Sequence, residues 1–409
     1  MSGVGIEQLN VYAGVAAIDT EELFRGRGLD LDRLANIQQS RRSLGLGFED
    51  PVTNAVHAAK PIIDRMGEAA ERIEMLIVSS ESGVDYSKSL ASYVHKYLGL
   101  GPHCRFLEVK QACYGASAAL QLALGYLGSG LSPGAKALVI ATDISLVDAR
   151  AGYAEPSTGF GAVAMLLGEQ GQVLTMDRGA FGLYSYETMD SARPTPTQDI
   201  ADVDRSLFAY LDCLGNSFKD YRSRVPEADF IGSFGQLCMH TPFAGLVQAA
   251  HRKMMRDEGK VADPAVVQED FARRLLPSLV YPKQVGNLCS GSLYLALASL
   301  IENRSGDEPV RVGLYAYGSG CSSEFMSGVI DARSRAALAP FGIAKALAAR
   351  TMVSFEQYER LLETTLKAIV PCQSRTVPIH HDEHLLPAER PRMLALAKIE
   401  QYQRHYEWI

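Results

Sequence analysis

The sequence lacks any apolar run approaching the roughly 20 residues that a membrane-spanning helix needs. Its first residues also lack the basic start and apolar core of a signal peptide. Positive charge is not in excess, since the formal net charge is −7, which argues against a nucleic-acid groove. These absences argue against a membrane protein and a nucleic-acid-binding protein, and they predict a cytoplasmic location.

Paired cysteines are missing as well. The seven cysteines are scattered, with no Cys-x-x-Cys pair and no zinc-ligand spacing, so we expect reduced thiols and no metal. His380, His381 and His384 stand close together in a polar segment, and that setting favours a solvated loop. With 409 residues, 47% of them hydrophobic, the chain has enough apolar material for one large or two medium cores.

What the sequence does contain is an alternation of buried strands and helices. Apolar runs of strand length are separated by helical patterns, and the clearest are Ile73 to Ser79, Ala135 to Ala141, Gly161 to Leu167 and Val310 to Tyr317. This order predicts an α/β protein whose strands are covered on both faces. Because both parts of the chain follow the same plan, we expect one compact unit of two similar halves, residues 1–170 and 171–409.

Cys113 lies at a predicted junction between a strand and a helix. Arg105 to Val109 is typical of a short buried strand, and apolar residues recur at helical spacing from Ala116 onward. The N–H groups and the dipole at the start of a helix stabilise a thiolate and lower the pKa of the thiol. A small core cysteine is the alternative, and a nearby base and acid would favour a nucleophile.

Other reactive side chains also follow apolar strands. Glu81 and His240 each come directly after one, and Gly318 and Ser319 lie in a glycine-rich turn whose N–H groups can face a ligand. Asn287 lies in a turn before a strongly apolar helix. Each residue alone is typical of a cap, a core position or a turn. Together, a thiol, a carboxylate, an imidazole and a donor-rich loop at strand ends predict an active site.

Five short motifs spread over nearly the whole chain carry a more specific signal. They are Ser80-Glu81-Ser82, Gln111-Ala112-Cys113, His240-Thr241-Pro242-Phe243, Gly286-Asn287 and Tyr317-Gly318-Ser319-Gly320. Together they resemble the 3-hydroxy-3-methylglutaryl (HMG) synthase family. The resemblance implies the five-layered αβαβα thiolase fold, a homodimer and an acyltransferase. The roles that it implies are nucleophile for Cys113, general base for Glu81, acid for His240, and acceptor or oxyanion contacts for Asn287, Gly318 and Ser319.

The reaction of that family explains why these residue types are needed. The Cys113 thiolate takes an acetyl group from a thioester, and Glu81 removes a proton from the acetyl methyl. The N–H groups of Cys113 and Ser319 are expected to stabilise the enolate, which attacks the β-ketone of an acceptor thioester. His240, whose ordinary pKa is near 6.5, is expected to protonate the new alkoxide, and water then cleaves the Cys113 thioester. The resemblance implies phosphopantetheine thioesters as substrates and no permanently bound cofactor.

The carrier of these thioesters is predicted from local charge. The stretch Ala244 to Ala250 is neutral, where family members of the mevalonate pathway carry lysines that serve the phosphates of coenzyme A. The amino-acid sequence from Glu81 to Tyr86 resembles that of the polyketide β-branching HMG synthases. We therefore expect two partners, an acetyl-donor acyl carrier protein and a β-ketoacyl acceptor carrier protein. Candidate contacts to a carrier or its arm are Arg33, in the basic segment Arg25 to Arg42, and Arg252 and Lys253.

Three alternatives stay open. A mevalonate-pathway HMG-CoA synthase would use the same chemistry on acetyl-CoA and acetoacetyl-CoA. A Cys/His thiol hydrolase would need no carbanion base, and a non-catalytic scaffold would only dock carrier proteins. The sequence leaves open acetyl or propionyl as the donor group, the acceptor chain and the identity of the carriers.

Overall fold

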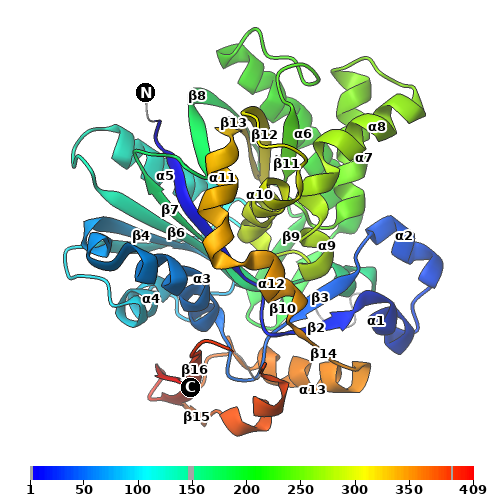
Figure 1. Cartoon of the computed structure of the whole chain (residues 1–409). Coiled ribbons are helices and arrows are strands. Elements are labelled where there is room, and N and C mark those ends of the chain that lie inside the picture. The colour runs from blue at the N-terminus through cyan, green and yellow to red at the C-terminus, as the bar shows by residue number, and fades with distance from the viewer. Residues whose placement is uncertain (1–2, 146–151, 388–389) are drawn as a thin grey trace.

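A nine-stranded sheet runs through the computed structural model, which describes residues 3–145, 152–387 and 390–409 (Figure 1). The strand order is β11-β12-β13-β8-β1-β7-β6-β4-β5. In chain order these strands are β1 (Gly5–Tyr12), β4 (Ile73–Ser79), β5 (Arg105–Val109), β6 (Lys136–Ile144), β7 (Phe160–Gly168), β8 (Leu174–Ser185), β11 (Gln236–Met239), β12 (Val310–Gly318) and β13 (Ser322–Ile330).

The sheet is continuous through a short junction only. Strands β1 and β8 pair at Gly5 with Thr175 and at Ile6 with Leu174, whereas β1 and β7 pair along most of their length. One part therefore consists of β1, β7, β6, β4 and β5, and the other of β8, β13, β12 and β11. Because the two parts share so few pairs, they can diverge and admit helices between them.

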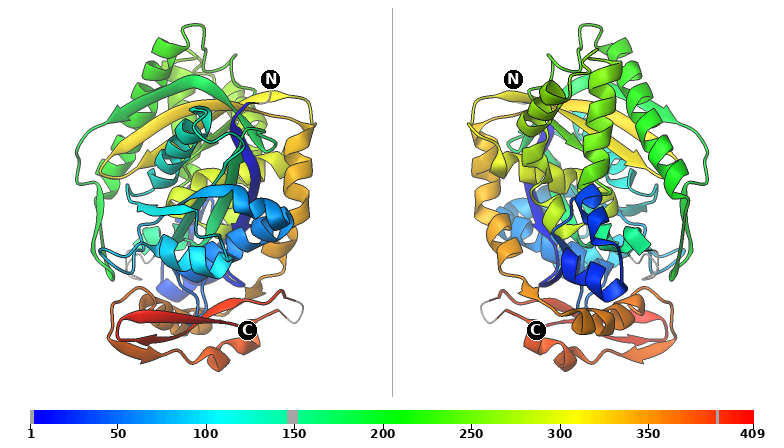
Figure 2. Two further views of the ribbon diagram at one scale, coloured as in Figure 1. Left: turned by 90° about the vertical axis from the view of Figure 1, so that its left-hand side faces the viewer. Right: turned by 90° about the vertical axis from the view of Figure 1, so that its right-hand side faces the viewer.

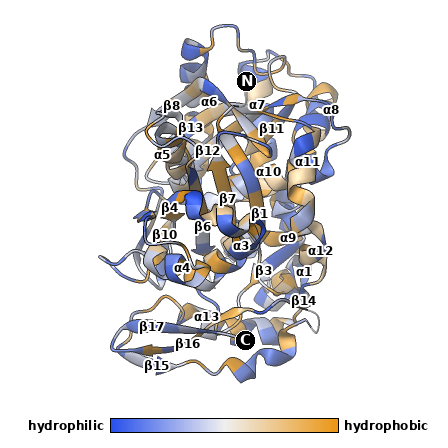
Figure 3. Cartoon of the chain, turned by 60° about the vertical axis from the view of Figure 1, so that its left-hand side comes forward, coloured by the Kyte–Doolittle hydropathy of each residue, from blue (hydrophilic) through white to orange (hydrophobic). Residues whose placement is uncertain are grey.

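Alternating side chains on the strands build separate cores on the two faces of each sheet part. On β6, Leu138 and Ile140 enter one core while Val139 enters the next. On β12, Leu314 enters the middle core while Tyr315 enters a third. Residues of a strand point alternately to opposite faces, so both parts of the sheet are covered twice. Many residues of the strands are hydrophobic (Figure 3).

The helices fill three layers around these two sheet parts (Figures 1 and 2). The outer helices on the first part are α3 (Pro51–Met66) and α4 (Leu90–Leu98). Between the parts lie α5 (Gly115–Gly128) and α10 (Ser292–Asn303), and the second part is covered by α6 (Val203–Arg224) and α7 (Ala244–Asp257). The result is the expected five-layered αβαβα arrangement of the thiolase fold.

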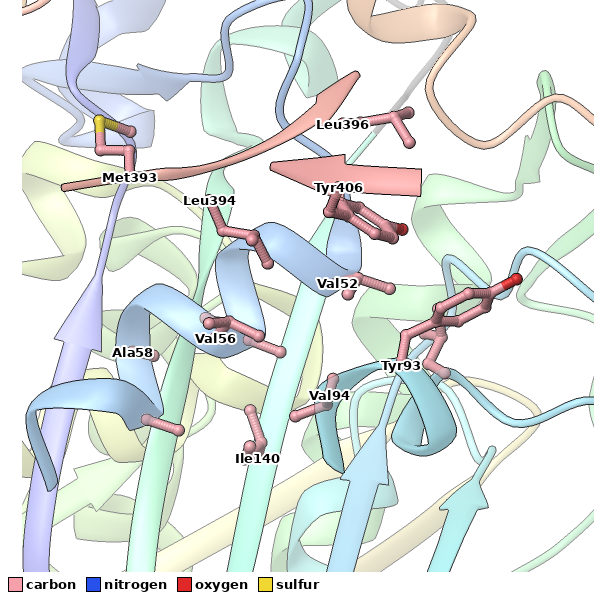
Figure 4. Packing of buried hydrophobic residues seen from close by; sticks show 14 of the residues in the cluster. Val52, Val56, Ala58, Tyr93, Val94, Ile140, Met393, Leu394, Leu396 and Tyr406 are labelled. Carbon is pink, nitrogen blue, oxygen red and sulfur yellow. The ribbon is translucent and has the colours of Figure 1, made fainter. Parts of the chain in front are cut away.

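Helix α3 also anchors the C-terminal segment. Asp50 caps the helix by accepting the N–H groups of Val52 and Thr53, and its second oxygen accepts hydrogen bonds from Arg404 (2.8 Å) and Tyr406 (2.7 Å). The side chains of Leu394 and Tyr406 point toward this helix, and Met393 and Leu396 belong to the same buried cluster (Figure 4). They belong to or flank a three-stranded sheet of β15 (Ser374–Thr376), β16 (Leu394–Glu400) and β17 (Gln403–Trp408).

The remaining elements are shorter and lie around this frame. Near the N-terminus they are β2 (Ala16–Asp19), α1 (Thr20–Arg27), the 3-10 helix η1 (Leu31–Arg33), α2 (Leu34–Ile37), β3 (Arg41–Leu44), and the 3-10 helices η2 (Gly67–Arg72) and η3 (Gly152–Ser157). Farther along they are β9 (Ser191–Thr195), β10 (Gln198–Ala201), α8 (Pro264–Arg274), η4 (Leu276–Leu279), α9 (Pro282–Val285), η5 (Cys289–Gly291), α11 (Ala332–Leu338), η6 (Ala339–Phe341), α12 (Ile343–Ala348), β14 (Thr351–Met352), α13 (Phe355–Leu366), η7 (Ile379–His381) and η8 (Glu383–Leu385).

One strand differs from its sequence-based description. Arg105–Val109 was expected to be buried, but β5 is the edge of the sheet, and its first three residues are exposed. Phe106 and Leu107 belong to this exposed part, so its apolar composition does not reflect burial within this chain. The division into halves 1–170 and 171–409 stays a prediction. Among the residues described, no helix is both long and apolar enough to cross a bilayer.

Candidate active site

Cys113 lies in a tight turn between β5 and α5. The preceding residue, Ala112, has a left-handed backbone (φ 43°), and the N–H of Gly115 bonds back to the Ala112 carbonyl (3.2 Å). A side chain at Gly115 would place its Cβ 2.4 Å from the Ser79 hydroxyl oxygen, so only glycine lets the helix start so close to β4. The residue as a whole is left partly exposed at the end of the sheet.

Glu81 reaches this thiol from the neighbouring strand. Strands β4 and β5 are parallel, so the segments that follow them emerge at the same edge of the sheet. The Glu81 Oε1 atom is 3.2 Å from the Cys113 Sγ atom. The structure therefore brings together the predicted nucleophile and the predicted base, which are separated by more than thirty positions in the chain.

Two residues that the sequence analysis did not single out hold the Glu81 turn in place. The Asp143 Oδ1 atom accepts the N–H of Glu81 (2.7 Å) and the hydroxyl of Ser82 (3.1 Å). Arg193 donates to the Ser82 hydroxyl (3.2 Å) and forms an ion pair with Asp199 (2.6 Å). The available signal was that Asp143 ends a buried strand, β6, whose parallel neighbour is β4.

The environment of Cys113 contradicts the expected effect of the helix start on its pKa. The pKa of the thiol is raised well above its ordinary value by contact with the Cys289 thiol, by burial and by the Glu81 carboxylate. The helix begins at Gly115, two residues after the cysteine, and its dipole does not outweigh these causes. The resting nucleophile is therefore a neutral thiol whose proton faces Glu81.

Cys289 is the largest omission of the sequence analysis. Its Sγ atom, the Cys113 Sγ atom and a Glu81 oxygen all lie within 4.8 Å of one another, a spacing that could also hold a metal ion. Burial and the Glu81 charge raise the pKa of Cys289 to about 11, although its contact with Cys113 lowers it. Spacing along the chain gave no sign of this pair, because Cys289 lies on η5, which packs against β6 and α5 in the folded chain.

His240 follows β11 and is almost fully buried. Its backbone N–H bonds to the Tyr315 carbonyl (2.7 Å), and its Nδ1 atom has no hydrogen-bond partner among the described residues. Burial lowers the pKa of the imidazole from its ordinary value near 6.5 to about 3. Within the described ranges, no hydrogen bond joins the imidazole to Cys113 or Glu81. At neutral pH His240 is an uncharged imidazole that can donate an N–H.

The glycine-rich turn after β12 lies against the nucleophile loop. A Cβ built on Gly318 would be 2.4 Å from the Tyr114 nitrogen, and the Gln111 amide donates to the Ser319 carbonyl (3.4 Å). Asp190 fixes the turn from the other side by accepting the Gly320 N–H (2.8 Å) and the Tyr317 hydroxyl (2.6 Å). This turn thus lies against residues on both sides of Cys113 in the chain, and Asp190 is a further residue that the sequence analysis missed.

Asn287 is placed by its own loop. Its Oδ1 atom accepts the N–H of Cys289 (3.0 Å) and the hydroxyl of Ser292 (2.7 Å). Since these two hydrogen bonds occupy the oxygen, the side-chain NH2 group is the part of Asn287 left for a substrate, to which it can donate a hydrogen bond. The loop thereby connects Asn287 to the second thiol of the site.

The predicted carrier contacts lie on adjacent elements. Arg33 is exposed at the end of η1, Arg252 is exposed on α7, and Lys253 pairs with Asp257 (2.7 Å). Helix α2, which follows η1, packs against α7, where Gln38 donates to Gln248 (2.5 Å).

Two other arginines of the basic segment serve the fold. Arg27 forms an ion pair with Glu155 (2.8 Å), and the buried Arg42 bonds to Thr158 (2.8 Å). The basic segment is therefore only partly available to a partner.

The five-layered fold and the thiol–carboxylate pair at its sheet edge define a thiolase-fold acyl-transferring enzyme. The family model "Hydroxymethylglutaryl-coenzyme A synthase N terminal" matches residues 1–172, and the corresponding C-terminal model matches residues 258–406. The Bacillus subtilis protein "Polyketide biosynthesis 3-hydroxy-3-methylglutaryl-ACP synthase PksG" is 45% identical over the full length of both chains. A hydroxymethylglutaryl-CoA synthase of Enterococcus faecalis is 32% identical, over 89% of this chain and 92% of its own.

Solved structures agree with these matches. The HMG synthase of the curacin biosynthetic pathway superposes with a TM-score of 0.95 at 44% identity, and PksG of Bacillus subtilis superposes with a TM-score of 0.96 at 44% identity; both matches cover 100% of each chain. The chain belongs to the hydroxymethylglutaryl synthase family, whose members are condensing enzymes that transfer acyl groups.

Proposed function

We propose that this protein adds an acetyl-derived carbanion to the β-ketone of a β-ketoacyl chain that is tethered to an acyl carrier protein, in polyketide β-branching. The observation that carries the chemistry is the 3.2 Å contact between Cys113 Sγ and Glu81 Oε1. The carrier assignment is supported by the 45% identity to an HMG-ACP synthase, against 32% to an HMG-CoA synthase. It is also supported by the solved complexes of the curacin HMG synthase with apo, holo and acetyl donor-ACP.

The first step of the proposed reaction forms an acetyl thioester on Cys113. Glu81 accepts the thiol proton as sulfur attacks the acetyl thioester of the donor, and the departing phosphopantetheine thiolate recovers that proton. General-base assistance is needed because the pKa of the Cys113 thiol is raised. Glu81 is then again a carboxylate, free for the next proton transfer.

The second step forms the carbon–carbon bond. Glu81 removes a proton from the acetyl methyl, and N–H groups of the Cys113 and Ser319 turns stabilise the enolate oxygen. The enolate carbon attacks the acceptor ketone, and His240, as an uncharged imidazole, donates a hydrogen bond to the developing alkoxide. The alkoxide takes up the proton that Glu81 removed from the methyl group, so Glu81 is a carboxylate again. Water then cleaves the thioester, which frees Cys113 and leaves a carboxylate on the branch.

Two partners and a dimer complete the proposal. Exposed Arg33 and Arg252 on neighbouring elements suit an acidic carrier protein with a single phosphodiester. Among the described residues, strand β5 is the edge of the sheet and exposes Phe106 and Leu107, which suits pairing with a second copy. A phosphopantetheine thioester is the substrate form, and the cytoplasm is the proposed location.

Intact-protein mass spectrometry tests the nucleophile and the carrier together. The protein is mixed in parallel with an acetyl-acyl carrier protein and with acetyl-CoA, and its peptides are mapped. The expected result is one acetyl group on the Cys113 peptide, formed faster from the carrier protein. Preferential labelling by acetyl-CoA would favour a mevalonate-type enzyme, and labelling at another residue would refute Cys113 as the nucleophile.

A further inference from the structure

A second thiol lies beside the proposed nucleophile, and the reaction described above gives it no role. The Sγ atoms of Cys289 and Cys113 are within 4.8 Å of each other. Cys113 is partly exposed while Cys289 is buried behind it. A reagent that reaches the partly exposed Cys113 from solvent therefore finds the Cys289 sulfur close to the Cys113 sulfur.

The backbone around Cys289 holds this position firmly. The residue has a left-handed conformation (φ 49°) that L-residues seldom adopt. Its N–H bonds to Asn287 Oδ1 (3.0 Å), and its Sγ atom lies 3.4 Å from the Ser145 hydroxyl. A strained conformation that is over-determined by its neighbours is typical of a functional position.

The other cysteines differ in placement. Cys213 and Cys321 form a close pair (Sγ to Sγ 3.4 Å), but both are buried. Cys372 is partly exposed, as Cys113 is, but it lies just before β15, in the C-terminal segment. The pair formed by Cys113 and Cys289 is thus the one that joins an accessible sulfur to a buried neighbour.

We propose that Cys113 and Cys289 form a reversible disulfide when a hydroperoxide enters the active site, so that the nucleophile is switched off and protected from irreversible oxidation. The proposal rests on the proposed function, since it takes Cys113 as the acyl-accepting thiol. It requires the two sulfurs to approach to about 2.05 Å by rotation of their side chains.

The chemistry balances in two steps. The hydroperoxide oxidises the Cys113 thiol to a sulfenic acid and is itself reduced to an alcohol, or to water in the case of hydrogen peroxide. The Cys289 sulfur then attacks the sulfenic sulfur, the S–S bond forms and water leaves, with the Cys289 proton released into it. A dithiol reductant reverses the bond by exchange. Without Cys289, further peroxide converts the sulfenic acid to a sulfinic acid.

Peptide mapping after treatment with hydrogen peroxide tests the proposal. The full-length protein, Cys289→Ser and the control Cys372→Ser are treated alike, and acetyl transfer is measured before and after dithiothreitol. We expect a cross-linked Cys113–Cys289 peptide and nearly full recovery in the wild type and the control. We expect sulfinic acid at Cys113 and a loss of at least about tenfold in recovered activity in Cys289→Ser.

The outcomes separate this proposal from the proposed function. Sulfinic acid at Cys113 in the wild type, or a cross-link only between Cys213 and Cys321, overturns the disulfide. Equal recovery of Cys289→Ser and wild type overturns it too. Because the cross-link is read by mass and not by turnover, a protein that forms it but never accepts an acetyl group refutes the proposed function alone.

Discussion

Replacing Glu81 with Gln should slow both the acetylation of Cys113 and the condensation that follows it. Only the acetylation rate should recover at high pH. The pKa of the Cys113 thiol is raised first by the Cys289 contact, then by burial and only after these by Glu81. Two of the causes therefore stay in Glu81→Gln. With a pKa above the ordinary value near 8.5, less than about 3% of the thiol is ionised at pH 7, so acetylation should slow by about 30-fold or more.

The pH dependence distinguishes the two roles of the carboxylate. Below the thiol pKa, the thiolate fraction rises about tenfold per pH unit, so acetylation of Glu81→Gln should rise with that slope. Condensation needs a base for the methyl proton and should stay slower by about 10² to 10⁴ at every pH. Rapid quenching and intact-protein mass measurement between about pH 6 and pH 9 follow acetyl-enzyme directly.

The exposed Glu68, on η2, provides a matched control as Glu68→Gln, which should behave as the wild type. Acetylation of Glu81→Gln at the wild-type rate at pH 7 would refute base-assisted attack by the thiol. Full turnover of this variant would instead favour a thiol hydrolase, which needs no carbanion base.

Further predictions concern buried groups. Asp190→Asn should weaken the glycine-rich turn, lower stability by about 1–3 kcal/mol and slow condensation, as thermal unfolding and single-turnover assays would show. Arg404→Met leaves the buried Asp50 carboxylate without its cation and should cost about 3–5 kcal/mol in urea unfolding; a loss below about 1 kcal/mol would contradict this. Burial lowers the pKa of His57 and His240 to about 3, so between about pH 6.5 and 3 the unfolded chain binds more protons. As the pH is lowered through this range, the free energy of unfolding should decrease by about 1.4 kcal/mol per pH unit for each histidine. His240→Gln should remove one of these two contributions from the slope of unfolding free energy against pH.

The layered fold could be predicted because its signals are local. The runs that became β4, β6, β7 and β12 are largely apolar, as is typical of strands that are buried on both faces. Strand β5 shows the limit of that signal, because Phe106 and Leu107 are apolar yet exposed at the sheet edge. An apolar composition predicts that a strand is covered by other residues. The strand order decides whether those residues belong to the same chain or to another one.

The proximity of Glu81 and Cys113 could be predicted from the sequence for a similar reason. Each residue ends a predicted strand, and parallel neighbouring strands deliver their ends to one edge. Cys289 lies on the short helix η5 and Asp190 lies just before β9, and the positions of both depend on how the second sheet part packs on the first. No spacing along the chain encodes that packing, so these residues appear only in three dimensions.

The protonation states of the site follow from the same packing and change the chemistry that the residues can perform. A cysteine at the start of a helix suggests a thiolate, but burial disfavours the charged forms of both Cys113 and His240. Burial leaves Cys113 and His240 neutral. The fold also places the Glu81 carboxylate next to the Cys113 sulfur. One carboxylate can then take the thiol proton, return it to the leaving group and be a free base again for the carbon acid. A resting thiolate would not need this cycle, so the order in which Glu81 handles its two protons links the burial of Cys113 to carbon–carbon bond formation.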